Sequence, residues 1–402
     1  MIITWTKSIV ICPLDSYNDC PNRKLSTGNE HRGYVMARVS TFDDWIDIFR
    51  NWSDGLGLDP EIAREYKFEA LYGDLHSPEV EFGDFAGRRK FEKVIEIPDQ
   101  RMRDALLQLV IVQGDTEFGS VEQQRRLVNS APSEHDLRSL TRVMREEMRH
   151  GWQMCHVMVQ HFGTSGKIES EKMLQRSADQ QGRLLGSFNE NVDHWLDFFV
   201  YTEFIDRDGK YQLTMLSHSA FAPVARSMGP MLKEEAFHLG TGHNGLKRIC
   251  RAGRMPVRLM QKYINKWVPT AYDLFGTDHS SSAHWSYVWG LKGRFDQHDA
   301  EFKDMENLNE HSRELYYGEI TGLFDQLNAL LPKDSAKLVV PSLKFNRSVG
   351  TYANEPYDMF GNRVRPDEWD EYVKSVLPTD EDRAEINSIC KDPSWIAPKQ
   401  AA

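Results

Sequence analysis

The stretch REEMRHGW, residues 145–152, places a glutamate and a histidine three positions apart in a region with helical periodicity. On an α-helix, Glu147 and His150 would lie one turn apart on the same face. That face also carries Leu140, Met144 and Met154, so the two polar side chains are expected to point into the core. Burying a carboxylate and an imidazole is unfavourable unless a partner compensates them. The stretch therefore predicts that both side chains bind something inside the fold.

The same spacing occurs a second time, in KEEAFH, residues 233–238, which contains Glu235 and His238. A further inward-facing carboxylate precedes each copy. Glu117 lies 30 positions before Glu147, and Asp206 lies 29 positions before Glu235. This near-equality indicates two copies of one pair of helices.

The periodicity predicts four helices, over residues 99–128, 134–162, 192–207 and 210–242. Ser133 is a candidate N-cap for the second helix, and Asp208-Gly209 is expected to separate the third from the fourth. Distortions are expected at Pro223 and at Gly229-Pro230.

One carboxylate helix and one Glu-x-x-His helix, occurring twice, is typical of four-helix bundles that hold a carboxylate-bridged pair of iron or manganese ions. Bridging anionic oxygens reduce the repulsion between two nearby cations. Hard carboxylates with one imidazole per metal suit iron that changes oxidation state. The alternative is that these are solvated charges on ordinary helices and histidines satisfied in the core. Their positions on apolar stripes argue against it.

The third helix offers two carboxylates one turn apart, Glu203 and Asp206. Proteins of this class often use glutamate at this position, and composition alone does not choose between the two. The repeat spacing favours Asp206.

The composition excludes several classes of protein. The 402 residues include 49 Lys and Arg against 60 Asp and Glu, a net charge of −11, which argues against a general nucleic-acid binder. No apolar run approaches the roughly 20 residues that span a bilayer, and the start lacks a secretory signal, so we expect a cytoplasmic protein that does not enter a membrane. The five scattered cysteines form no Cys-x-x-Cys motif. Any metal must therefore be held by Glu, Asp and His.

The predicted fold class is mainly α. We expect an N-terminal extension over 1–40, with Met36 as an alternative start, an accessory helical segment over 41–98 and the metal-binding core over 99–300. A C-terminal extension over 301–402 would pack on the core. In it, short apolar runs such as KLVVPSLKF (337–345) predict some strand, which makes this extension mixed.

Several stretches resemble the family of the oxygenase component of benzoyl-coenzyme A 2,3-epoxidase. They are IVQGDTEFGSVEQQR (111–125), REEMRH (145–150), FIDRDGKYQL (204–213), LKEEAFH (232–238), GLKGRF (290–295), FNRSVG (345–350) and DPSWIAP (392–398). The resemblance is strong over about residues 95–300, weak before about residue 80 and absent over 1–40. The chain departs from the family in looking shorter between GLKGRF and FNRSVG, a region that could shape the substrate entrance.

The resemblance implies a ferritin-like four-helix bundle core with additional helices and a di-iron centre. It implies iron ligands at Glu117, Glu147, His150, Asp206, Glu235 and His238, of which the four carboxylates are also the predicted catalytic residues. It also decides the third-helix alternative in favour of Asp206. The implied function is a monooxygenase that uses O2 and electrons from a separate flavin and iron–sulfur reductase, itself using NAD(P)H. The substrate would be the aromatic ring of an aryl-CoA thioester, with benzoyl-CoA converted to 2,3-epoxybenzoyl-CoA.

Candidate substrate-binding residues lie near these motifs. Gln113, one turn before Glu117, is expected either to hydrogen-bond a thioester carbonyl or to bond a neighbouring helix. Asn189 is a similar candidate, with helix capping as its alternative role. Lys292 and Arg294 are candidates for the CoA phosphates. Arg347 is a further one.

Three other functions compete with this one. The first is a related di-iron oxygenase acting on a different substrate, by another arene epoxidation, by N-oxygenation or by desaturation. The second is the radical-carrying protein of ribonucleotide reductase, which needs a tyrosine beside one iron. Tyr201 precedes Asp206 by five residues, a poor helical match for the same side. The third is iron storage, which the large flanking segments disfavour. The chain is expected to be a monomer or a homodimer.

Overall fold

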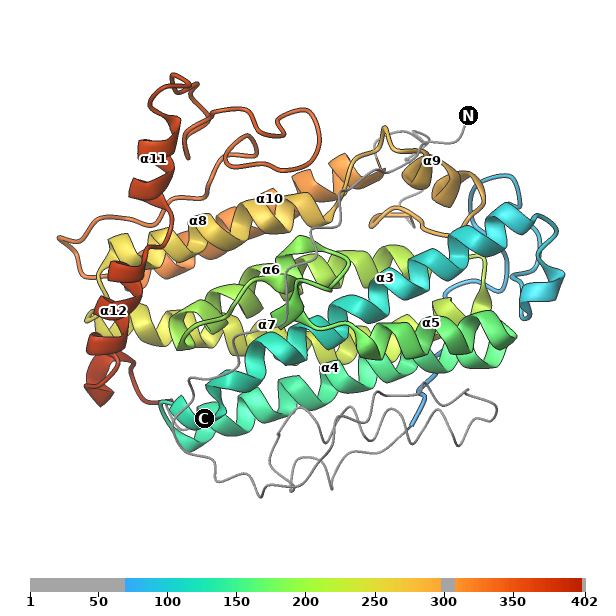
Figure 1. Ribbon diagram of the computed structural model, residues 1–402, viewed down its shortest axis with the longest axis horizontal. Coiled ribbons are helices and arrows are strands. Elements are labelled where there is room, and N and C mark those ends of the chain that lie inside the picture. The colour runs from blue at the N-terminus through green and yellow to red at the C-terminus, as the bar shows by residue number, and fades with distance from the viewer. Residues whose placement is uncertain (1–68, 298–307, 400–402) are drawn as a thin grey trace, which may run out of the picture. The chain divides into compact units, whose positions relative to one another are not determined.

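The structure, a computed structural model, describes residues 69–297 and 308–399, all within the unit Val39–Ala402 (Figure 1). The predicted extension 1–40 and residues 41–68 of the accessory segment lie outside the described residues. The described α-helices are α3 (Gln100–Gln124), α4 (Glu134–His161), α5 (Gly163–Gln175), α6 (Trp195–Ser217), α7 (Ala222–Ala252), α8 (Val257–Leu274), α9 (Ser281–Val288), α10 (Leu308–Leu330), α11 (Trp369–Val376) and α12 (Asp380–Ile389). Among them, no helix has both the length and the apolar character needed to cross a membrane.

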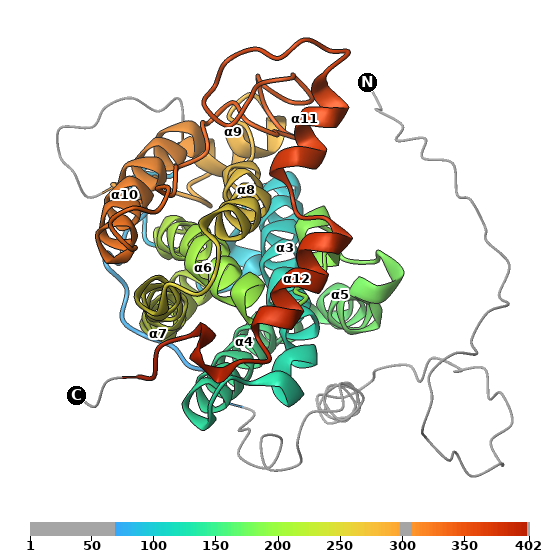
Figure 2. The same ribbon diagram turned by 90° about the vertical axis from the view of Figure 1, so that its left-hand side faces the viewer.

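Helices α3, α4, α6 and α7 form the core bundle (Figure 2). α3 packs against α4, α6 packs against α7, and α4 meets α7. The short connections within each pair make its helices antiparallel neighbours. α5 packs on α4, α8 packs on α6, and α10 contacts both α6 and α7. The predicted mainly helical, ferritin-like bundle is confirmed.

Side chains cap the first two bundle helices, and for the second helix the cap is the predicted residue. The Asp99 carboxylate accepts a hydrogen bond from the Arg101 N–H at 2.8 Å. Ser133, the predicted N-cap of α4, accepts one from the Asp136 N–H at 3.2 Å. Each cap satisfies one of the backbone donors that the first helical turn leaves unpaired.

The predicted break at Asp208-Gly209 is wrong, because α6 continues through it to Ser217. Glycine costs only about 1 kcal/mol in a helix interior, which tertiary contacts easily override. The chain turns at residues 218–221 instead, where backbone groups find partners outside the bundle. The Ala220 N–H donates to the Gly290 carbonyl at 2.6 Å. The Lys90 ammonium donates to the carbonyls of His218 and Ser219 at 2.9 and 3.0 Å.

The prolines of α7 act differently from one another. Pro223 lies in the first turn, where no N–H is needed, so the predicted distortion there is wrong. Pro230 lies inside the helix and cannot donate to the carbonyl of Arg226. The Gly73 N–H donates to that carbonyl instead, at 2.8 Å. A segment from before the bundle therefore supplies the hydrogen bond that the proline removes.

The predicted strand in the C-terminal extension is wrong. Residues 331–399 contain α11, α12, a short 3-10 helix over Pro393–Trp395 and only an isolated bridge between Tyr357 and Arg363. In KLVVPSLKF, backbone N–H groups donate hydrogen bonds to side chains of neighbouring helices. The Leu338 N–H donates to Asn328 Oδ1 and the Val339 N–H to Gln261 Oε1, both at 2.8 Å. With these partners on α10 and α8, the apolar run needs no neighbouring strand.

Glycines bring the bundle helices close together beside the inward-facing carboxylates. A Cβ at Gly151 of α4 would lie 2.4 Å from the ring of Phe118 on α3. A Cβ at Gly242 of α7 would lie 2.5 Å from the backbone nitrogen of Glu203 on α6. The missing side chains therefore set the spacing within both helix pairs, and with it the positions of the carboxylates.

Candidate metal centre

The structure brings the six predicted ligands together from all four bundle helices. They are Glu117 on α3, Glu147 and His150 on α4, Asp206 on α6, and Glu235 and His238 on α7. All six are buried, with at most 7% of their surface exposed. They form two groups in which one ligand-type atom from each residue lies within 4.8 Å of the others. One group is Glu117, Glu147, His150 and Glu235, and the other is Glu147, Asp206 and His238.

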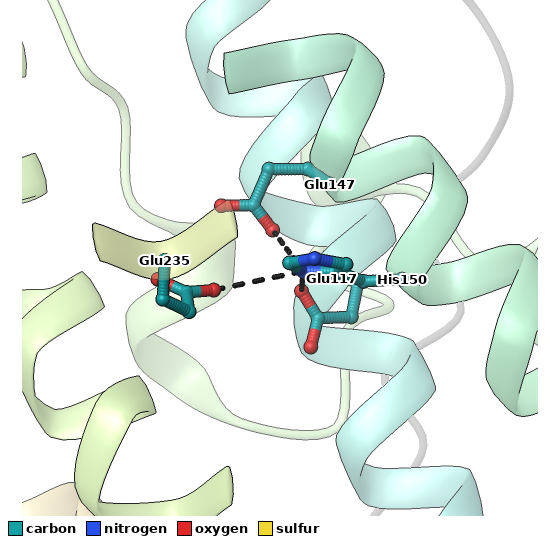
Figure 3. Close-up of side chains that lie close together, drawn as sticks. All are labelled: Glu117, Glu147, His150 and Glu235. Carbon is teal, nitrogen blue, oxygen red and sulfur yellow. Dashed lines mark ion pairs between the residues drawn. The ribbon is translucent and has the colours of Figure 1, made fainter. Parts of the chain in front are cut away.

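The imidazole of His150 faces three carboxylates at once (Figure 3). Its Nδ1 atom lies 3.4 Å from Glu117, 3.9 Å from Glu147 and 3.5 Å from Glu235. His238 occupies the matching position, with its Nδ1 atom 3.4 Å from both Glu147 and Glu235. Each histidine therefore points the same ring nitrogen at the shared carboxylates.

The outer ring nitrogens of the two histidines bind carboxylates that the sequence interpretation missed. His150 Nε2 lies 2.8 Å from Glu234 Oε2, and His238 Nε2 lies 3.1 Å from Glu146 Oε2. Burial alone would raise the pKa of Glu234, but hydrogen bonds from His150 and Arg149 lower it to about 2. The sequence feature that could have identified Glu146 and Glu234 is the pair of consecutive glutamates in both REEMRH and KEEAFH. Such outer carboxylates fix the orientation and tautomer of an imidazole that binds a metal.

Several inward-facing atoms lack a hydrogen-bond partner within the described part of the chain. They are Asp206 Oδ2, Glu235 Oε2, His150 Nδ1 and His238 Nδ1. The two Nδ1 atoms face carboxylates only at ion-pair distances of 3.4–3.9 Å, and buried polar atoms seldom lack a hydrogen bond, so these atoms have room for a further partner. All four are atoms that ligate metal ions.

The charge balance also fits bound cations. Burial, together with the negative charge of Glu235, raises the pKa of Asp206 well above its ordinary value. Burial and the neighbouring Glu117 do the same to the pKa of Glu147. Positive charge at the centre would offset the repulsion between these neighbouring carboxylates. Four hard carboxylates with one imidazole on each side therefore suit two divalent ions.

The two carboxylates considered on α6 point to different surroundings. Asp206 belongs to the cluster. Glu203 lies 3.1 Å from His243 Nδ1 and 3.3 Å from the guanidinium of Arg207. Glu203 therefore pairs with cationic or imidazole partners outside both groups.

A cavity of about 580 Å³ adjoins the cluster and is lined in part by Glu117, Glu147, Asp206 and Glu235. Tyr201 also lines it, from a different stripe of α6 than Asp206. Residues five apart differ by about 140° around a helix, but α6 is buried on nearly all sides and borders the cavity over more than one stripe.

Two predicted substrate-binding residues line this cavity. The Gln113 amide donates to Glu117 Oε1 at 2.6 Å, one turn outward from the cluster. The Lys292 ammonium donates to Gln212 Oε1 at 2.7 Å. Burial lowers the pKa of Lys292 to about 8.

The structure places the other three candidates elsewhere. Asn189 holds a loop by exchanging hydrogen bonds with the backbone of Arg183, at 2.9 and 3.0 Å. Arg294 pairs with Asp296 at 3.1 Å. Arg347 is buried against Asp273, at 2.6 Å. Within the described residues, none of the three lines the cavity.

A four-helix core with two Glu-x-x-His helices, two further buried carboxylates and an adjoining cavity defines a ferritin-like candidate di-metal enzyme. A family model described as phenylacetic acid catabolic protein matches residues 93–328. The chain is 32% identical over 433 aligned positions to benzoyl-CoA oxygenase component B of Aromatoleum evansii, covering 88% of this chain and 91% of the relative. It is 25% identical over 124 positions to a 1,2-phenylacetyl-CoA epoxidase polypeptide from Escherichia coli (strain K12), covering 30% of this chain and 40% of that relative.

The chain belongs to the phenylacetic acid catabolic protein family. The predicted resemblance to benzoyl-CoA oxygenases is confirmed, and so is the prediction that the protein is an oxygenase, which is an oxidoreductase.

Proposed function

We propose that the chain is the oxygenase component of a multi-component system that epoxidises the ring of an aryl-CoA thioester, with benzoyl-CoA giving 2,3-epoxybenzoyl-CoA. One observation carries the proposal. The carboxylates of the cluster form part of the cavity wall, so a ring in the cavity would lie directly beside them. The relative that covers most of the chain carries a name that states benzoyl-CoA as its substrate and describes it as one component of an oxygenase.

Two iron ions would be held by the two groups of the cluster. Glu117, Glu147, His150 and Glu235 would hold one ion, and Glu147, Asp206 and His238 the other. Iron bound there supplies the chemistry that activates O2. One oxygen atom enters the ring, and the other leaves as water with two electrons and two protons. A separate flavin and iron–sulfur reductase using NAD(P)H would deliver the electrons.

The chain's own residues position the substrate and exclude water. Gln113 has a second amide hydrogen besides the one it donates to Glu117, and this hydrogen would bind the thioester carbonyl. Apolar side chains such as Leu109, Phe188 and Ile205 surround the ring position. Holding the ring fixed and dry next to the reacting centre is the main contribution a protein makes to such a reaction.

The test is oxygen consumption by the iron-loaded chain with a reductase and NAD(P)H, measured with benzoyl-CoA, with phenylacetyl-CoA and without a thioester. We expect consumption coupled to benzoyl-CoA, and a product that gains one atom from ¹⁸O2 by mass spectrometry. Coupling to phenylacetyl-CoA alone would keep the aryl-CoA class and change the substrate. Consumption that no thioester stimulates would contradict the proposal.

A further inference from the structure

The outer part of the cavity contains an exposed tryptophan. Trp285 of α9 lines the cavity and keeps 38% of its surface exposed. Its ring stacks on that of Trp289, with centroids 4.8 Å apart and planes 25° from parallel. Trp289 is buried and therefore supports Trp285 from one side. A single exposed aromatic residue is ordinary on a protein surface, but a supported one in a cavity wall provides a flat platform for a ligand.

Helix α3 links this platform to the metal cluster. Glu117 is buried, Gln113 is half-buried and Gln108 is exposed, and all three line the cavity. Ala105, which also lines it, lies twelve residues before Glu117, or about 18 Å along the helix. α9 packs on α3, at the end of α3 where the chain enters it (Figure 1). The cavity therefore runs outward along α3 from the cluster to the tryptophan pair.

A positive charge lies beside the platform. The guanidinium carbon of Arg101 is 5.8 Å from the ring centroids of both Trp285 and Trp289. Arg101 is largely exposed and pairs with Asp99. Arginine binds phosphate groups well because its planar fork of donors matches their oxygens. An aromatic platform with an adjacent guanidinium suits a purine nucleotide that carries phosphates.

We propose that Trp285 stacks on the adenine ring of coenzyme A and that Arg101 attracts the adjoining phosphates. This inference rests on the proposed aryl-CoA function. The acyl group would lie beside the cluster, and the extended pantetheine arm would follow α3 outward to the nucleotide at Trp285. Trp285 is then a residue that selects the CoA thioester over smaller thioesters of the same acid.

The first measurement is calorimetric binding of adenosine 3′,5′-bisphosphate, the nucleotide end of CoA, to the iron-loaded chain. Trp285→Ala should weaken this binding about tenfold or more, whereas Trp285→Phe should retain most of it because it keeps an aromatic face. Phe360→Ala is the matched control, since Phe360 is 65% exposed and is not one of the described residues lining the cavity. It should bind the nucleotide as the wild type does.

The second measurement compares two substrates. For benzoyl-CoA, Trp285→Ala should lower kcat/KM by about tenfold, mainly through KM. For the benzoyl thioester of N-acetylcysteamine, which lacks the nucleotide, wild type and variant should give the same kcat/KM. Equal loss with both substrates, or no loss with either, would overturn the inference.

The two proposals can fail separately. Nucleotide binding that depends on Trp285, without thioester-stimulated oxygen use, would uphold the nucleotide site and refute the reaction. Thioester-dependent oxygenation with nucleotide binding independent of Trp285 would uphold the reaction and refute the site.

Discussion

His150 Nε2 lies 2.8 Å from Glu234 Oε2, so α7 holds the imidazole of α4 from outside the cluster. The arrangement is reciprocal, because Glu146 of α4 holds His238 of α7 at 3.1 Å. The two glutamates of each pair therefore have different roles. The second residue faces the cluster, and the first orients the histidine on the other helix.

This reciprocity predicts that Glu234→Gln and Glu146→Gln weaken metal binding by similar factors. Outer carboxylates of this kind typically contribute about 10- to 100-fold in metal affinity. The measurement is competition for iron against a chelator, with Glu355→Gln as a control because Glu355 pairs with Arg363 on the surface. Unchanged affinity in both variants would show that these contacts do not orient metal ligands.

The close approach of α6 and α7 predicts opposite effects for two alanine substitutions in one helix. Gly242→Ala should destabilise the fold by about 1–3 kcal/mol, because its Cβ would lie 2.5 Å from the backbone of Glu203, which cannot easily move. Gly240→Ala meets nothing within 4 Å and should stabilise the fold by about 0.5–1 kcal/mol. Urea unfolding of both variants measures the difference. A loss at Gly240 equal to that at Gly242 would disprove the steric explanation.

Lys292 predicts a specific dependence of stability on pH. Burial lowers its pKa from 10.5 to about 8, near Asp208 and Asp278. Between pH 8 and 10.5 the unfolded chain therefore binds more protons at this site, so its contribution to stability rises with pH over that range. Lys292→Met should lack this rise, whereas the control Lys333→Met, at an exposed position, should keep it. Unfolding free energies at pH 7.5 and pH 10 test this. Identical pH dependence in wild type and Lys292→Met would refute the lowered pKa of Lys292.

The sequence predicts the centre of the candidate site well because helical spacing is a local property. Glu147 and His150 share a face through their separation alone, and the near-equal distances to Glu117 and Asp206 identify the partner helices. Helical spacing alone does not show that Tyr201 and Asp206 both line the cavity, because a fully buried helix borders it over more than one stripe.

Features that depend on distant partners could not be read from local patterns. α6 ends at Ser217 because Gly290 and Lys90 bind the following backbone, and neither is near in sequence. The apolar run near Val339 forms no strand because Gln261 satisfies its N–H from another helix. In both cases a tertiary hydrogen bond decided between conformations that local propensity allows.

If the buried cluster holds two iron ions, the iron content of the purified chain will show it. We predict about two irons in the wild type and a loss of iron in His150→Ala. His243→Ala should retain both ions, because His243 pairs with Glu203 outside the cluster. Iron content in His150→Ala equal to that of the wild type, or a wild-type chain that binds no metal, would contradict the account.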